Sequence, residues 1–300
     1  MCQDVLNHHL LTGTYTYAGP YAKYYKSLPD DIAELGSLVY HQIIHRMFLQ
    51  IESQNPAYHV PGNMCDYPWY RMRCEDDILL TATAMTAELF RMDHQGFYTG
   101  RAVKHKIVVT CRYAAILMAA ILKAKGIPCR CRSGFNIYAN PDYGYDHWIN
   151  QYWSAKESRW INLDVHAYMG QDSVGFDQFN IPDERIGWVA QIWLDVRLGK
   201  RNGQNYVIGG TDIKSFRAII LALFYEFHAL MNNEISYLFR PSYVDINVNG
   251  RFENVPEHEL QEIDKLCELM LNPDENFDAL VDIWNTEKKF RILNSPLATF

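Results

Sequence analysis

Hydrophobic residues recur at helical spacing in the first hundred positions of the chain. Residues 30–53 place Leu35, Leu38, Val39 and Ile43 about one helical turn apart, which predicts a helix. Residues 76–92 show the same period and begin with acidic residues, which suit the positive end of a helix dipole. Residues 55–70 are rich in Pro, Gly, Asn and aromatic residues and predict a loop.

A different pattern occupies the middle of the chain. Residues 112–125 are apolar nearly all round, which predicts a buried helix that Gly126 ends and Pro128 prevents from resuming. Residues 129–138 alternate, which predicts a strand with Cys129 and Cys131 on one face. Aromatic-rich residues 147–153 and 160–164 predict a hairpin. Helical patterns return at residues 186–198, 213–238, 257–271 and 277–284.

These elements predict an α+β fold in which helices from both ends of the chain surround a compact sheet. We expect one domain over residues 1–300, with a core at about 105–168 and mainly helical additions at 1–104 and 169–300. The hydrophobic fraction of 48% is sufficient for a substantial core.

Charge and cysteine content narrow the functional classes. A net charge of -7 argues against a nucleic-acid-binding protein. Seven scattered cysteines favour free thiols in a reducing cytoplasm over a disulfide framework. The N-terminus lacks a secretory pattern, and the apolar run at 218–231 is interrupted by Glu226 and His228, so we expect no membrane segment.

Three residues carry the candidate chemistry. Cys111 begins the apolar helix, and His147 and Asp164 lie on the two predicted hairpin strands. A helix N-terminus favours the thiolate, and its N–H groups can hold the oxyanion formed when a thiolate attacks a carbonyl. An imidazole can serve as the base and a carboxylate can orient it.

The spacing of the hairpin permits the imidazole and the carboxylate to meet. A tight turn at residues 155–156 would place His147 directly opposite Asp164, with Cβ atoms about 5 Å apart. A wider turn would make them diagonal neighbours on the same face, still within reach.

Metal sites are weakly supported by the sequence. Cys129 and Cys131 form a Cys-x-Cys pair that lacks two further ligands at suitable spacing. His41 and His45 lie four apart on a predicted helix, but Gln42 follows His41, so the metalloprotease pattern is absent. Core packing is favoured for the two cysteines and a surface or packing role for the two histidines, and we expect no metal and no cofactor.

The central segment resembles the transglutaminase-like superfamily of cysteine enzymes. The matched positions are Cys111 before a small-residue helix, the exit at residues 126–128, Arg130 on the next strand, His147-Trp148, and Trp160 with Leu163-Asp164. Weaker similarity to a group of bacterial transglutaminase-like proteins extends beyond this core. The resemblance implies a papain-like α+β fold, with the cysteine helix packed on an antiparallel sheet, and acyl transfer by Cys111, His147 and Asp164.

The chain also departs from the pattern of the superfamily. Arg112-Tyr113 stands where many relatives have an acidic residue, and Val165 stands where proline usually follows the aspartate. An upstream tryptophan often assists the oxyanion; Trp69 is the one before Cys111, and its neighbours Tyr67 and Tyr70 are equal candidates.

Four residues are candidates for substrate binding: Trp69, Arg112, Asp146 and Trp148. Three of them have a structural alternative. Arg112 is as well explained by a salt bridge to Asp146 or another acid, Asp146 by a turn, and Trp148 by the core of the hairpin. His166 is a fallback base because it lies close to the hairpin.

The sequence thus predicts a cysteine-dependent acyl-transfer enzyme that acts on a peptide, protein or small amide, with hydrolysis weakly favoured over transfer to an amine. Two alternatives remain: a coenzyme A-dependent N-acyltransferase, whose Arg-Gly-Gly-x-Cys context is absent here, and a non-catalytic binding protein that retains the fold. The substrate, the oligomeric state and the activity of the triad are left open.

Overall fold

The computed structural model describes residues 2–47, 67–71, 73–167, 175–241, 256–291 and 293–294. These residues form two compact units, each assembled from separate stretches of the chain. Unit 1 comprises residues 1–6, 132–147 and 184–300, and unit 2 comprises residues 7–131 and 148–183. Two strands, β3 (Cys129–Asn136) and β4 (Gly144–Ser154), contribute residues to both units. The expected single domain over residues 1–300 stays a prediction.

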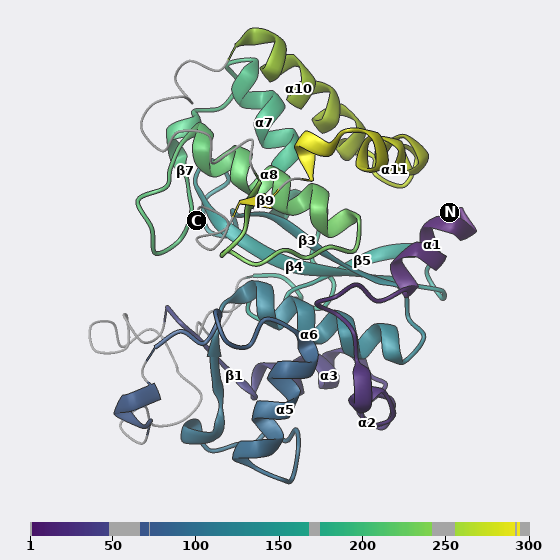
Figure 1. Ribbon diagram of the computed structural model, residues 1–300, viewed down its shortest axis with the longest axis vertical. Helices are drawn as coiled ribbons and strands as arrows, with labels where there is room; N and C mark the ends of the chain where they lie inside the picture. The colour runs from purple at the N-terminus through teal and green to yellow at the C-terminus, as the bar shows by residue number, and fades with distance from the viewer. Residues whose placement is uncertain are drawn as a thin grey trace. The chain divides into compact units, whose positions relative to one another are not determined.

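Unit 2 is built around helix α6 (Cys111–Ala124), whose residues from Cys111 to Lys123 are all buried. Three further helices pack against it, as Figure 1 shows: α2 (Ala22–Lys26), α3 (Ile32–Tyr40) and α5 (Ala82–Met92). The helix ends as the sequence predicts, because Gly126 adopts a φ of +84°, which is rarely accessible to other residues. A buried apolar helix of this kind gains its stability from the shell that removes it from water.

A short parallel pair of strands leads into α6. Strand β1 (Ile43–His45) pairs with β2 (Ile107–Val109), and His45 lies opposite Val109. The predicted helix over residues 30–53 is therefore wrong beyond Tyr40, and residues 48–53 lie outside the described part of the chain. β-branched Ile43 and Ile44 pack well in a strand, and His41 Nδ1 hydrogen-bonds back to the carbonyl of Ser37 at 2.7 Å where α3 ends.

The predicted hairpin is present, but its turn is longer than the two-residue turn at residues 155–156. Strand β5 (Arg159–Leu163) pairs antiparallel with β4, with Asn150 opposite Leu163 and Ser154 opposite Arg159. Four residues, 155–158, form the turn, and Ser158 takes a φ of 53°. The two-residue turn at 155–156 is therefore wrong and the wider alternative holds.

Within unit 2, the buried side-chain amide of Asn150 joins α6 to the strands. Asn150 Nδ2 of β4 donates to the carbonyl of Ala115 at 2.9 Å and lies 3.8 and 3.7 Å from the sulfur atoms of Cys129 and Cys131. Both cysteines are fully buried, which agrees with the packing role expected for them. Strand β3 is buried on both faces, although its sequence alternates.

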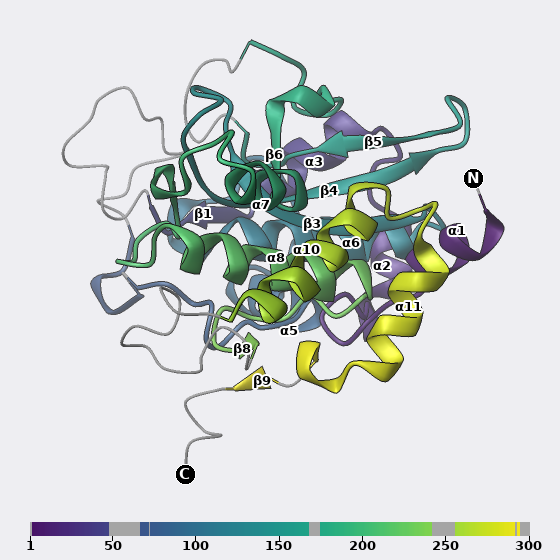
Figure 2. The same ribbon diagram turned by 90° about the horizontal axis from the view of Figure 1, so that it is seen from above.

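Unit 1 consists mainly of helices beside short strands. Helix α7 (Val189–Arg197) packs against α8 (Phe216–Leu230) and α10 (Glu257–Leu271), and α10 also contacts α11 (Phe277–Thr286), as Figures 1 and 2 show. Strand β6 (Ile186–Trp188) pairs antiparallel with the Gly134–Asn136 end of β3, and β7 (Tyr206–Val207) pairs parallel with the start of β4. The expected helix at 186–198 thus begins only at Val189.

The remaining described elements are short. They are α1 (Gln3–Leu10), η1 (Gly19–Tyr21), η3 (Trp69–Arg71), η4 (Val103–His105), η5 (Asp183–Arg185), η6 (Gly203–Asn205), β8 (Arg240–Pro241), η8 (Lys288–Phe290) and β9 (Leu293–Asn294). The combination of helices with antiparallel strand pairs confirms the predicted α+β class. Within the described ranges, no helix has both the length and the apolarity needed to cross a bilayer.

Candidate functional site

Cys111 is the first residue of α6, directly after β2 and the connecting residue Thr110. Its side chain is buried, with 5% of its surface exposed. Thr110 has an extended backbone (φ -90°, ψ 177°) and makes no side-chain capping hydrogen bond. The first turn of a helix carries partial positive charge, so a sulfur anion at this position is favoured electrostatically.

Asp164 lies one residue beyond the end of β5 in unit 2. It is 2% exposed, and its Oδ1 accepts a hydrogen bond from the backbone N–H of His166 at 2.8 Å. Its own N–H donates to the carbonyl of Gln178 at 2.9 Å. These contacts fix the backbone around the carboxylate, and the bond from the N–H of His166 to the side chain of Asp164 is that of an Asx turn.

His166 belongs to a buried aromatic cluster in unit 2. Its ring centroid lies 5.5 Å from those of Tyr40 and His45. His45 is on β1, opposite Val109, so it is not on a helix with His41, and the four-residue zinc spacing does not apply. Among the described residues, no group of three or more His, Cys, Asp or Glu side chains could hold a metal ion.

His147 is the last residue of unit 1 before β4 continues into unit 2. It is buried, and its ring lies 6.0 Å from that of Tyr138 in an edge-to-face arrangement. Its meeting with Cys111 and Asp164 stays a prediction.

The four candidate substrate-binding residues occupy very different environments. Arg112 is fully buried, and its guanidinium carbon lies 4.8 Å from the ring of Tyr15 and 4.6 Å from that of Tyr113. The same carbon lies 6.0 Å from the ring of Trp148, which is also buried. Such cation–π contacts stabilise a buried guanidinium.

Trp69 and Asp146 are more accessible. Trp69 is 84% exposed and stands edge-to-face with Tyr70, whereas Tyr67 is buried. Asp146 is half-buried, and its Oδ1 accepts the N–H of Gly209 at 2.6 Å, which gives it a structural role in unit 1. The substrate-binding roles of all four residues stay predictions.

The sequence reasoning missed Glu75 and Asp76. The predicted helix over residues 76–92 begins at Asp76 and leaves Glu75 out, but α5 begins only at Ala82, with Thr81 as its N-cap. Instead, Glu75 Oε2 accepts the N–H of Val108 at 2.9 Å and Asp76 Oδ1 accepts the N–H of Thr110 at 3.0 Å. No sequence pattern could identify these partners, because a backbone N–H carries no residue identity.

Comparison with known proteins agrees with the resemblance seen in the sequence. Residues 95–165 match the family model of the transglutaminase-like superfamily. No curated protein matches the chain significantly. A solved structure from Cytophaga hutchinsonii, named as a putative cysteine protease, is similar at 13% identity and a TM-score of 0.34, covering 62% of this chain and 46% of its own. The chain thus spans less than half the length of that protein.

Proposed function

We propose that this protein, whose residues 95–165 match the transglutaminase-like superfamily, is a cysteine-dependent acyl-transfer enzyme that acts on an amide or peptide bond. The observation that carries this proposal is the position of Cys111. It is the first residue of a buried helix, and it lies inside the matched segment. A nucleophile at this point has N–H groups of the helix start beside it, which suits charge development on a carbonyl oxygen.

In the proposed reaction, the sulfur of Cys111 attacks the carbonyl carbon and forms a C–S bond. His147 takes the thiol proton and returns it to the amine as the C–N bond breaks. The resulting thioester is resolved by water, which gives an acid, or by an amine, which gives a new amide. We favour hydrolysis, as expected from the sequence, and no metal or cofactor enters these steps.

The strand register supports Asp164 as the group that orients His147. If the pairing of Asn150 with Leu163 continues by one residue, Asp164 lies opposite Ile149. His147 precedes Ile149 by two residues on the same strand, so side chains at both positions point to the same side. A diagonal imidazole–carboxylate contact is therefore proposed in place of a directly opposed one.

Alkylation and substrate turnover test this proposal together. Iodoacetamide at pH 7 is expected to label Cys111 much faster than Cys267, because burial raises the pKa of the Cys267 thiol well above its ordinary value. Mass spectrometry of a glutaminyl peptide library should show new products with the parent and none with Cys111→Ala.

The same assay separates the mechanism from its alternatives. His147→Gln and Asp164→Asn should lower kcat by on the order of 10³-fold or more if they act as base and orienting group. Cys267→Ser is the matched thiol control and should leave turnover unchanged. A Cys111 that is alkylated no faster than Cys267 would favour the non-catalytic binding protein, and a thioester formed from acetyl-coenzyme A would favour the N-acyltransferase.

A further inference from the structure

Strand β2 has one edge that β1 does not cover. The parallel pairing uses Ile107, whose N–H donates to the carbonyl of Gln42, and Val109, whose carbonyl accepts from Arg46. The backbone groups of successive residues point to opposite edges of a strand, so every second residue faces the same edge. The groups of residues 106, 108 and 110 therefore face away from β1 and need other partners, since buried backbone groups are almost always hydrogen-bonded.

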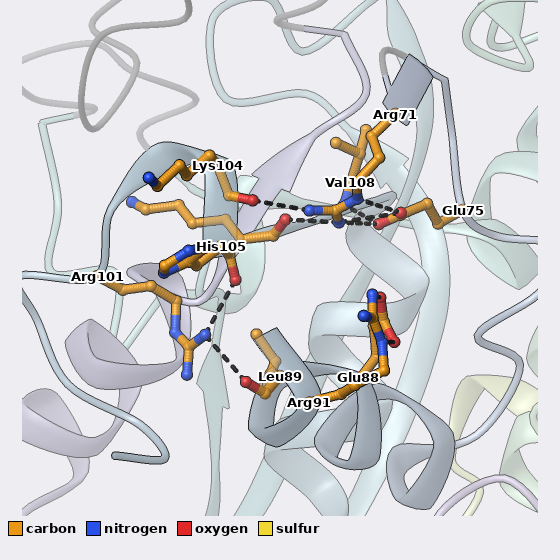
Figure 3. A network of polar contacts seen from close by, with 10 residues as sticks. Arg71, Glu75, Glu88, Leu89, Arg91, Arg101, Lys104, His105 and Val108 are labelled. Atoms are coloured by element: carbon orange, nitrogen blue, oxygen red, sulfur yellow. Dashed lines mark hydrogen bonds and ion pairs between the residues drawn. The ribbon is translucent and has the colours of Figure 1, made fainter. Parts of the chain in front are cut away.

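Side chains from one short segment of unit 2 supply those partners. Arg71 Nη1 donates to the carbonyl of Lys104 at 2.8 Å, and Arg71 Nη2 donates to that of Lys106 at 3.0 Å. Glu75 bonds Val108 twice, through its N–H (2.7 Å to the carbonyl) and through Oε2 (2.9 Å from the N–H). Arg71 and Glu75 also form an ion pair at 3.0 Å. Figure 3 shows these side chains beside the strand.

Asp76 continues this series at the entrance to α6. Its Oδ1 accepts the N–H of Thr110 at 3.0 Å, and its backbone carbonyl accepts the hydroxyl of Tyr113 at 2.6 Å. Asp76 thus holds the residue before Cys111 and a residue two positions after it.

We propose that Asp76 is a positioning residue that holds the start of α6, and with it the sulfur of Cys111, in the geometry that acyl transfer needs. This inference rests on the proposed function of Cys111. Its basis is that Thr110 makes no side-chain cap of its own. The hydrogen bond that its N–H donates to Asp76 Oδ1 is therefore a contact that fixes the backbone at this point. Misplacement of a reacting group by about 1 Å can lower a rate by about 10²-fold.

The charge of Asp76 also bears on the thiol. Burial raises the pKa of Asp76 above its ordinary value, while hydrogen bonds to Cys74 and Thr110 and the positive charge of Arg46 act in the opposite direction. An ionised carboxylate near the helix start disfavours a second negative charge on sulfur. Removing the charge while keeping the acceptor oxygen should therefore favour the thiolate.

Two variants separate position from charge. Asp76→Ala removes both the acceptor and the charge, and we expect it to slow iodoacetamide alkylation of Cys111 by about 10- to 100-fold relative to the equally uncharged Asp76→Asn and to speed hydrogen exchange at the amide of Thr110. Asp76→Asn keeps an acceptor oxygen, so exchange at Thr110 should stay slow. In this variant the pH of half-maximal alkylation should shift to a lower value. Asp77→Asn, which changes the exposed neighbouring acid, is the control and should alter neither readout.

The outcomes distinguish the positioning role of Asp76 from the proposed acyl-transfer function of Cys111. If Cys111 reacts rapidly in the parent but both Asp76 variants leave its pH profile and the exchange of Thr110 unchanged, the positioning role is overturned and the enzyme proposal survives. If Cys111 is inert in the parent, both proposals fail. Asp76→Asn gives a readout even if Asp76→Ala does not fold.

Discussion

Lys106 illustrates at the residue scale how a surface pattern can conceal a buried charge. Residues 104–106 are Lys-His-Lys, a basic cluster of the kind that usually lies in solvent, and Lys104 is exposed. Lys106, however, is 1% exposed, directly before β2. Burial, with a further contribution from the nearby charge of Arg101, lowers the pKa of Lys106 from 10.5 to about 8.

This shift predicts a pH dependence of the free energy of unfolding. Between pH 8 and 10.5 the unfolded chain holds more protons on this residue than the folded chain, so stability rises with pH across that window. Below pH 8 the lysine is charged in both states, and burying the charge opposes folding. Lys106→Met should therefore stabilise the protein at pH 7 by on the order of 3 kcal/mol.

Urea denaturation at pH 7 and at pH 10 measures the effect. The stabilisation by Lys106→Met should shrink as the pH rises towards 10, and Lys104→Met, on the exposed neighbour, should change stability by less than about 0.5 kcal/mol at either pH. A Lys106→Met protein that is less stable than the parent at pH 7 would contradict the prediction.

At the scale of elements, strand β3 is joined to helix α8 by one buried carboxylate in unit 1. Glu226 of α8 accepts a hydrogen bond from the guanidinium Nε of Arg132 at 2.5 Å and another from the N–H of Ser133 at 2.6 Å. Glu226 and Arg132 are 2% and 6% exposed, and the Arg132 guanidinium also lies 4.3 Å from the ring of Trp188.

Glu226→Ala should therefore destabilise the protein by about 3–5 kcal/mol, because it leaves a buried guanidinium without its charged partner. Chemical denaturation monitored by circular dichroism measures this loss. Glu268→Ala, at an exposed glutamate in helix α10, is the matched control and should change stability by less than about 0.5 kcal/mol. Equal effects of the two substitutions would show that the buried pair does not join β3 to α8 energetically.

At the scale of the whole molecule, neither unit is a continuous stretch of sequence. Residues 7–131 of unit 2 depend on residues 148–183 for several buried contacts. Arg130, for example, donates from Nε to Gln151 at 2.8 Å, and its guanidinium lies 4.3 Å from the ring of Trp160. Asn150, which joins α6 to the strands, also belongs to the later stretch.

A fragment of residues 7–131 is accordingly expected to lack a cooperative unfolding transition, because these contacts and the burial of α6 are lost. A fragment of residues 7–183 contains both stretches and should regain one. Thermal melts followed by circular dichroism compare the two. Cooperative unfolding of the shorter fragment would show that residues 7–131 fold without the hairpin.

The sequence predicted the features that depend on local pattern. The buried helix from Cys111, its end at Gly126 and the two hairpin strands follow from periodicity and turn chemistry, so the structure reproduces them within a few residues. The predicted helix over residues 30–53 runs past the end of α3 because Ile43 and Ile44 fit both a helical period and a strand. Only their pairing with β2 decides between the two.

For the candidate site, the sequence by itself determined which residue types are available and that Cys111 begins a helix. Only the tertiary structure decided which side chains surround that helix start. Arg71, Glu75 and Asp76 bind backbone atoms 33 to 35 residues away. Lys106 is buried although nearby Lys104 is exposed. The physical reason is that a backbone carbonyl or N–H is the same at every residue, so the partner that satisfies it is chosen by the fold and leaves no pattern in the sequence.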